Sequence, residues 1–359
     1  MTLYRSAGYA SFGMAAFLFV VFCAAPAART SAEEVVNVYS SRKPEFITPL
    51  LKVFEQLTDI KANVIYAKSD LVERIAAEGA NSTADILLAN EFSQLVAAKE
   101  LQITQPVMKP LLAERINFAY RDPGGYWFGL SRRARIVLAS KTRVKQNSFT
   151  YEELADPKWK GRVCIRSVRH PYNIILIASL LAHKGEAWTE KWLRGLKNNL
   201  AIKPAGGDRT QAANIHAGKC DVALVNTYYM GAMLMNDKKP EQKEWAASVK
   251  LIFPNAADRG SHVSISGMAL AKHAPNAANG ILLMDFLTSE PAQFIYALEN
   301  HEYPIRDDVA PSKLVSSWGK LKSDFVPLER LAKLSDKARY LVDQIDFDVV
   351  RSAKRSQAK

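Results

Sequence analysis

The sequence has few of the residues and patterns on which metal enzymes and hydrolases rely. It holds six histidines and three cysteines, and it contains neither a His-Glu-x-x-His nor a Cys-x-x-Cys pattern. This argues against a zinc site. A Gly-x-x-x-x-Gly-Lys loop for nucleotide phosphates and a Gly-x-Ser-x-Gly nucleophile turn are also missing. No pair of carboxylates has a spacing that suggests acid–base catalysis. We therefore expect a binding protein rather than an enzyme.

Long hydrophobic runs are missing too, apart from one close to the start of the sequence. Residues 14–22 are apolar, Arg5 precedes them, and small alanines follow them. A helix needs about 20 apolar residues to span a bilayer, so this run is short for a permanent anchor. The pattern is typical of an export signal. We expect residues 1–32 to be a signal peptide and the mature protein to be periplasmic.

The rest of the composition indicates a globular chain with excess positive charge. With 359 residues, 48% of them hydrophobic, the chain is long enough for two lobes. Lysine and arginine number 48 against 36 acidic residues, a net charge of +12, and part of this excess lies in a basic tail at 346–359. Basicity can indicate nucleic-acid binding, but an export signal argues against such a partner. An anionic ligand or a positively charged cleft explains the charge better.

Two cysteines, Cys164 and Cys220, remain once the signal peptide is removed. Because two cysteines in an exported protein often pair, we expect a disulfide. Both also lie in strand-like runs, so two buried free thiols are the alternative.

Strand and helix patterns alternate along the chain. The runs 35–39 and 86–88 indicate strands, and apolar residues at helical spacing over 46–57 indicate a helix that tolerates Pro49 only in its first turn. Asp70 has the features of an N-cap for a further helix that Gly79 ends. The alternation recurs later, which predicts an α/β protein with two sheets. Its ligand cleft should lie between two lobes, at the carboxyl ends of strands.

Three tyrosines follow predicted strands of the second sheet. Tyr228 and Tyr229 come after the strand 222–225, and Tyr172 comes shortly after the strand that contains Cys164. Phenolate is a hard oxygen donor, which suits a hard trivalent cation such as Fe³⁺. The alternative is that these tyrosines only fill the core or the surface.

Basic residues near the expected cleft are candidates for binding an anion. They are Arg42, Arg132, Arg133 and Arg135, of which the last two would share one face of a strand where the chain crosses between lobes. Interlobe salt bridges are the alternative role for this pair.

Several segments, in order, resemble the ferric-iron-binding proteins of bacterial ABC transporters. They are Val38-Tyr39-Ser40-Ser41-Arg42, Glu78-Gly79-Ala80-Asn81-Ser82-Thr83-Ala84-Asp85, Trp127-Phe128-Gly129-Leu130-Ser131, Arg133-Ala134-Arg135, Asp156-Pro157-Lys158-Trp159-Lys160-Gly161-Arg162-Val163-Cys164-Ile165-Arg166-Ser167, Cys220-Asp221-Val222-Ala223, Asn226-Thr227-Tyr228-Tyr229, Ser266-Gly267-Met268-Ala269-Leu270, Lys272-His273-Ala274-Pro275-Asn276 and Asn300-His301-Glu302-Tyr303-Pro304.

The resemblance implies a type II periplasmic binding protein fold, with two α/β lobes joined by β-strand crossovers. We expect residues 33–135 and 264–345 to form one lobe with the C-terminal helices, and residues 136–263 to form the other. The implied role is to capture Fe³⁺, with or without a synergistic anion or as a ferric chelate, and to deliver it, as a monomer, to an inner-membrane permease. A metal-free anion or a small organic solute, such as a phosphonate or a thiamine-like compound, is the alternative cargo. A different metal is a further alternative, because the family's full ligand set is not present.

The resemblance also implies the iron ligands. Three tyrosine ligands of the family match Tyr172, Tyr228 and Tyr229, but a His-Tyr pair that the family has after Arg42 is replaced here by Lys43-Pro44. Carbonate, citrate, another small chelator or water would then complete the coordination of the iron. Arg42, Lys43 or Arg133 would hold such an anion, with Arg135 as a further candidate for this role or for supporting a tyrosinate.

Overall fold

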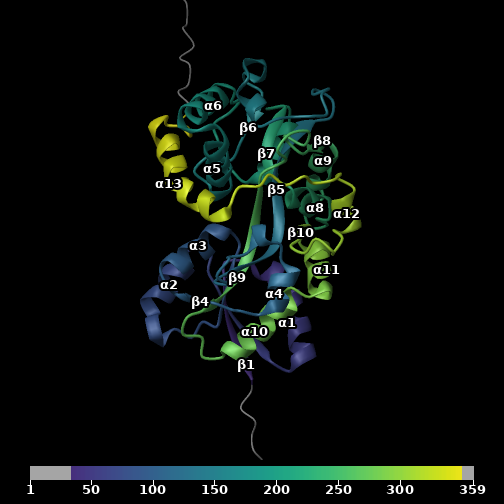
Figure 1. Cartoon of the computed structure of the whole chain (residues 1–359). Coiled ribbons are helices and arrows are strands. Elements are labelled where there is room, and N and C mark those ends of the chain that lie inside the picture. The colour runs from purple at the N-terminus through teal and green to yellow at the C-terminus, as the bar shows by residue number, and fades with distance from the viewer. Residues whose placement is uncertain (1–33, 350–359) are drawn as a thin grey trace, which may run out of the picture. The chain divides into compact units, whose positions relative to one another are not determined.

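The computed structural model describes residues 34–349 (Figure 1). The expected signal peptide at 1–32 and all but the first few residues of the basic tail lie outside them. Within the described residues ten strands form one continuous mixed sheet system. The strands are β1 (Val35–Ser40), β2 (Lys61–Tyr66), β3 (Ile86–Ala89), β4 (Thr104–Gln105), β5 (Phe128–Ser140), β6 (Val163–Cys164), β7 (Val222–Asn226), β8 (Val249–Ile252), β9 (Val263–Ala271) and β10 (Tyr303–Pro304).

Helices cover both parts of this sheet system. The α-helices are α1 (Pro44–Thr58), α2 (Leu71–Glu78), α3 (Phe92–Glu100), α4 (Pro110–Arg115), α5 (Pro171–Lys184), α6 (Glu186–Asn198), α7 (Asp208–His216), α8 (Tyr228–Leu234), α9 (Glu241–Ala247), α10 (Ala277–Leu287), α11 (Glu290–Glu299), α12 (Lys313–Ser316) and α13 (Leu328–Gln344). Four short 3₁₀ helices are η1 (Gly79–Asn81), η2 (Phe118–Tyr120), η3 (Glu152–Ala155) and η4 (Pro157–Trp159). Among residues 34–349, no helix is both long and apolar enough to cross a membrane.

The first sheet is built around β1. This strand pairs in parallel with β2 on one side and with β3 on the other, and β9 runs antiparallel to β3. β3 is buried along its whole length, as expected for a strand covered on both faces. Because β1 and β3 are parallel, the residues that follow them, Ser41-Arg42 and Asn90-Glu91, lie at the same edge of the sheet.

The second sheet repeats this arrangement with β6 and β7. These strands are parallel, and β5 and β7 are antiparallel. The loops after β6 and β7 therefore meet at one edge and lead into α5 and α8. A disulfide joins Cys164 of β6 to Cys220, just before β7, with their Cα atoms 5.9 Å apart.

The long strand β5 joins the two sheets (Figure 1). Residues 128–134 pair with β9 in the first sheet, and residues 135–140 pair with β7 and β8 in the second. The segment 322–324 also runs alongside this crossing. Ser261 N–H donates to the carbonyl of Lys322 at 2.8 Å, and Asp324 N–H donates to the carbonyl of Ser261 at 2.8 Å. The two-lobed α/β fold with β-strand crossovers is thus confirmed.

Two local predictions about helices have different outcomes. Asp70 does precede α2 and Gly79 does end it, although Asp70 adopts a left-handed conformation and makes no side-chain cap. The prediction for Pro49 is wrong, because α1 begins at Pro44 and Pro49 lies inside it, past the first turn. The apolar face formed by Ile47, Leu50, Leu51 and Phe54 is buried, and this packing offsets the hydrogen bond that proline cannot make.

The last helix, α13, lies against both lobes. It packs mainly on α5, as Figure 1 shows, and it buries Leu328, Leu331, Ala338, Leu341 and Val342. At its start Glu329 accepts a hydrogen bond from Lys99 of α3 at 2.8 Å. Just past its end, Asp348 accepts hydrogen bonds from Ser167 Oγ at 2.6 Å and from Val168 N–H at 3.0 Å. The chain after α13 therefore holds the loop that leads into α5.

Candidate metal centre

Tyr172, Tyr228 and Tyr229 reach one place because two helices begin there. Pro171 occupies the first turn of α5, and His170 caps the helix by accepting from Tyr172 N–H at 3.3 Å. α8 begins at Tyr228, directly after β7 and the single residue Thr227. Since α5 and α8 start at the same edge of the second sheet, the side chains of their first turns converge.

The three phenols form a contiguous cluster. The hydroxyl oxygens of Tyr172 and Tyr228 are 3.1 Å apart, and the rings of Tyr228 and Tyr229 are 4.3 Å apart. Tyr228 is buried, while the other two are half-buried. Within residues 34–349, no group of three or more His, Cys, Asp or Glu side chains is placed to hold a metal. The three phenol oxygens are therefore the clustered oxygen donors in this region.

Burial favours the protonated hydroxyl at Tyr172 and Tyr228. It raises the pKa of Tyr172 to about 12 and the pKa of Tyr228 well above its ordinary value, although the charge of Arg133 lowers both. A bound trivalent cation would act in the opposite direction, because it would be the largest local charge in the site. Metal binding and loss of the phenolic protons are therefore coupled.

A cavity of about 170 Å³ lies in front of the phenols and is lined from both lobes. The second sheet contributes the three tyrosines and Arg209. The first sheet and the loops beside it contribute the other lining residues, which are Ser41, Arg42, Lys43, Glu45, Phe46, Asn90, Glu302 and, from β5, Arg133. The cavity therefore depends on the juxtaposition of the two lobes.

Arg133 lies close to the phenols, with its guanidinium carbon 5.6 Å from the ring centre of Tyr172. Its Nη2 donates to Glu91 at 3.0 Å and to the carbonyl of Asn90. Its Nε and Nη1 are buried and have no hydrogen-bond partner. A buried guanidinium with unused N–H groups is suited to bind an anion in the cavity.

Arg42 and Lys43 reach the cavity from the opposite side. Nη2 of Arg42 donates to Glu302 at 2.9 Å, and both side chains are buried. Nε of Arg42 has no hydrogen-bond partner. Lys43 is exposed and pairs with Glu45 at 3.3 Å. Pro44 starts α1, so the stretch where the resembling family has a His-Tyr pair provides a helix start and no metal ligand.

Arg135 does not line the cavity. It lies beneath the phenols, where it donates to Asp208 at 2.7 Å, to Asn173 at 2.8 Å and to Asn226 at 3.2 Å. Asn173 directly follows Tyr172 in the chain, and Asn226 lies two residues before Tyr228. Arg135 therefore ties together the two segments that carry the phenols, whereas Arg42, Lys43 and Arg133 face the cavity itself.

Glu45 and Arg209 are among six lining residues that were not expected from the sequence. The others are Ser41, Phe46, Asn90 and Glu302. Glu45 lies in the first turn of α1, two residues after Lys43. Arg209 follows Gly206-Gly207-Asp208, which looks like an ordinary turn, and its guanidinium carbon lies 5.6 Å from the ring centre of Tyr229. No short-range pattern links either residue to the tyrosines.

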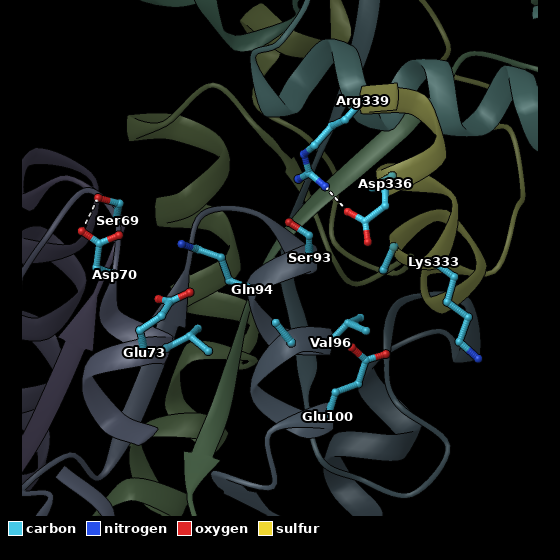
Figure 2. Close-up of a pocket in the computed structure, with 14 residues that line it drawn as sticks. Ser69, Asp70, Glu73, Ser93, Gln94, Val96, Glu100, Lys333, Asp336 and Arg339 are labelled. Carbon is cyan, nitrogen blue, oxygen red and sulfur yellow. Dashed lines mark hydrogen bonds and ion pairs between the residues drawn. The ribbon is translucent and has the colours of Figure 1, made fainter. Parts of the chain in front are cut away.

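A separate hollow of about 560 Å³ lies between α2, α3 and α13 (Figure 2). Its charged groups have mixed sign, and Arg339 pairs with Asp336 at 2.7 Å. None of the three clustered tyrosines lines this hollow. The phenol cavity is therefore the better candidate site.

The sequence and the fold of this chain are similar to those of several known proteins. A family model described as a bacterial extracellular solute-binding protein matches residues 81–322. Iron uptake protein A1 of Synechocystis sp. is 44% identical over 310 residues, which is 86% of this chain and 86% of that one. A Bordetella ferric binding protein is 43% identical with a TM-score of 0.83, over 88% of this chain and all of that one. A Trichodesmium protein solved with iron and citrate ligands is 37% identical with a TM-score of 0.83, over 87% of this chain and 99% of that one.

Proposed function

The chain belongs to the bacterial extracellular solute-binding proteins, and from that premise we propose that it captures Fe³⁺ in the periplasm for an inner-membrane ABC permease. The observation that carries the proposal is the convergence of Tyr172, Tyr228 and Tyr229 on one cavity. Hard phenolate donors favour a hard trivalent ion over the softer divalent metals. The similarity to iron uptake and ferric binding proteins supports the same cargo.

The remaining coordination positions are filled by a small anion in this proposal. Three phenolates balance the charge of Fe³⁺ but leave an octahedral ion with open positions. Carbonate or citrate would fill them, held by the unused N–H groups of Arg133 and Arg42. Glu45, which also lines the cavity, is a further oxygen donor. The Trichodesmium relative with iron and citrate ligands supports an anion in this role.

Capture proceeds by closure of the lobes around the ion. We assign residues 33–135 and 264–345 to one lobe and residues 136–263 to the other, with α13 lying against both. Because both lobes line the cavity, a bound ion makes its full set of contacts only when they are together, and this shifts the population to the closed state. The closed monomer then docks on the permease, and no nucleic acid takes part.

The test is an absorption spectrum of the purified mature protein with and without ferric citrate. Wild-type protein should show a broad visible band from phenolate-to-iron charge transfer, and Tyr229→Phe should weaken it. Tyr303→Phe is the matched control, because Tyr303 is buried but does not line the cavity, and it should leave the band unchanged. No band with any ferric salt would rule out direct iron binding, and metal-free anions and organic solutes would then be screened.

A further inference from the structure

Arg209 is a cation of the cavity that lacks a carboxylate partner. It lies in the first turn of α7 and faces the ring of Tyr229. Its Nε is buried without a hydrogen-bond partner, and no ion pair to Arg209 occurs within residues 34–349. The guanidinium is therefore held beside the phenols by a ring contact alone.

Every other cation that lines the cavity is already compensated. Arg42 pairs with Glu302, Arg133 pairs with Glu91, and Lys43 pairs with Glu45. These three pairs are electrically neutral, and an Fe³⁺ ion with three phenolates is neutral as well. Among the lining residues, Arg209 is thus the cation that has no protein carboxylate beside it, so its N–H groups are available to an anionic group of the cargo.

The cavity has room for more than a metal ion. A single water needs roughly 10–15 Å³ of such space, whereas this cavity measures about 170 Å³. Arginine binds carboxylates through two parallel N–H···O bonds. A chelator with several carboxylates can offer a whole carboxylate to the guanidinium while others coordinate the iron. Carbonate that chelates the metal through two oxygens has one oxygen left, so it cannot make this paired contact.

We propose that Arg209 binds a carboxylate of the cargo that is not coordinated to iron, so that the protein selects ferric polycarboxylates over Fe³⁺ with carbonate. This rests on the proposed function of the phenol site and adds a subsite to it. Arg209 lies on the lobe that carries the phenols, so the subsite and the phenolates can bind one chelate before the lobes close.

The test compares two forms of the cargo in Arg209→Gln. Protein is loaded with ferric citrate that contains radiolabelled citrate, or with Fe³⁺ and bicarbonate, and the iron, the label and the visible band are measured after gel filtration. Wild-type protein should retain about one citrate for each iron. Arg209→Gln should lose at least tenfold in affinity for ferric citrate and retain little label, while its affinity for iron with bicarbonate should change by less than twofold.

Further variants separate the subsite from simpler effects. Arg209→Lys keeps the charge but not the paired donors, and it should recover only part of the citrate affinity. Arg194→Gln alters an exposed arginine of α6 that pairs with Glu190, and it should behave like the wild type. Equal losses for both forms of cargo, or no loss for either, would overturn the subsite. Absence of the band in wild-type protein with both forms would instead overturn the iron site itself.

Discussion

At the scale of single residues, Arg133 uses only one nitrogen of its guanidinium within the protein. Nη2 donates to Glu91 and to the carbonyl of Asn90, while Nε and Nη1 have no hydrogen-bond partner. Burial by itself lowers its pKa, but Glu91 and the neighbouring phenols outweigh that effect and raise it. Arg133 therefore stays charged at every pH at which the protein is folded. Its charge stabilises the buried Glu91 carboxylate and lowers the pKa of Tyr172 and Tyr228 at the same time.

Replacing this residue should separate the two effects. Arg133→Met leaves the Glu91 carboxylate buried and unpaired, and we expect it to destabilise the protein by about 3–5 kcal/mol. The phenols should also become harder to deprotonate, so the iron band should appear at a higher pH. Urea unfolding measures the first effect, and a pH titration of the visible band measures the second.

The double variant Arg133→Met with Glu91→Gln provides the control. Removing both charges should restore most of the lost stability, because no buried charge stays unpaired. The band should still titrate at the higher pH. If it titrates as in the wild type, the charge of Arg133 does not act on the phenols.

The sequence predicts the phenol cluster better than it predicts the cations around it. Tyr172, Tyr228 and Tyr229 each follow a strand of one sheet, so their convergence follows from the ends of parallel strands. Arg209 and Glu45 come from different lobes, and their approach depends on how those lobes face each other. Such a contact leaves no periodic or short-range pattern in the chain.

At the scale of elements, α8 meets the turn between α11 and β10 at Gly231. A β-carbon added at Gly231 would lie 2.4 Å from Cγ of His301, which is less than any real contact distance. His301 itself has a positive φ of 55°, so the turn has little freedom to yield. α8 carries Tyr228 and Tyr229, and this contact therefore fixes how closely the helix approaches the other lobe.

Gly231→Ala should consequently weaken iron binding without touching an expected ligand. The added methyl group would push α8 away from His301 and oppose closure, and we expect at least a tenfold rise in the dissociation constant for ferric citrate. Gly207→Ala is the control, since a β-carbon there meets no atom within 4 Å. Unchanged affinity in Gly231→Ala would mean that the contact yields easily and does not limit closure.

Most strands and helices follow from periodicity, and the exceptions have a physical cause. The strand expected at 35–39 is β1, and the helix expected at 46–57 lies within α1. Pro49 was expected near a helix start on grounds of local sterics. The structure keeps it inside α1 because tertiary burial of Leu50, Leu51 and Phe54 outweighs the local cost.

At the scale of the whole molecule, the phenols link stability to pH. The pKa of Tyr172 rises from its ordinary value of 10.0 to about 12 in the folded protein. The folded state then holds its proton more tightly than the unfolded state. The contribution to stability is full below pH 10 and is lost as the pH rises towards 12.

Iron-free protein should therefore lose thermal stability between about pH 10 and pH 12. Tyr172→Phe, which cannot ionise, should reduce that loss. Stability is lost as the pH rises, whereas iron affinity should be lost as the pH falls. The reason is that protons compete with the metal for the phenolates. Melting temperatures across this range check the first expectation, and a variant that loses stability as the wild type does would contradict it.

The two-lobed fold was accessible from the alternation of strands and helices together with the resemblance of ordered segments. The lining of the cavity was not. It assembles residues from both lobes, such as Ser41 and Tyr229, and the course of β5 through both sheets joins these lobes. Residues that meet across lobes are set by the packing of whole sheets.

The position of Asp348 in the chain has a consequence for the timing of synthesis. Asp348 holds the loop before Tyr172 through Val168, which lies 180 residues earlier. At about 5–20 residues per second, a ribosome adds those 180 residues in roughly 9–36 s. The Tyr172 loop can gain this clamp only after α13 has been made, so a chain that is interrupted before Asp348 would reach the periplasm with an incomplete phenol site.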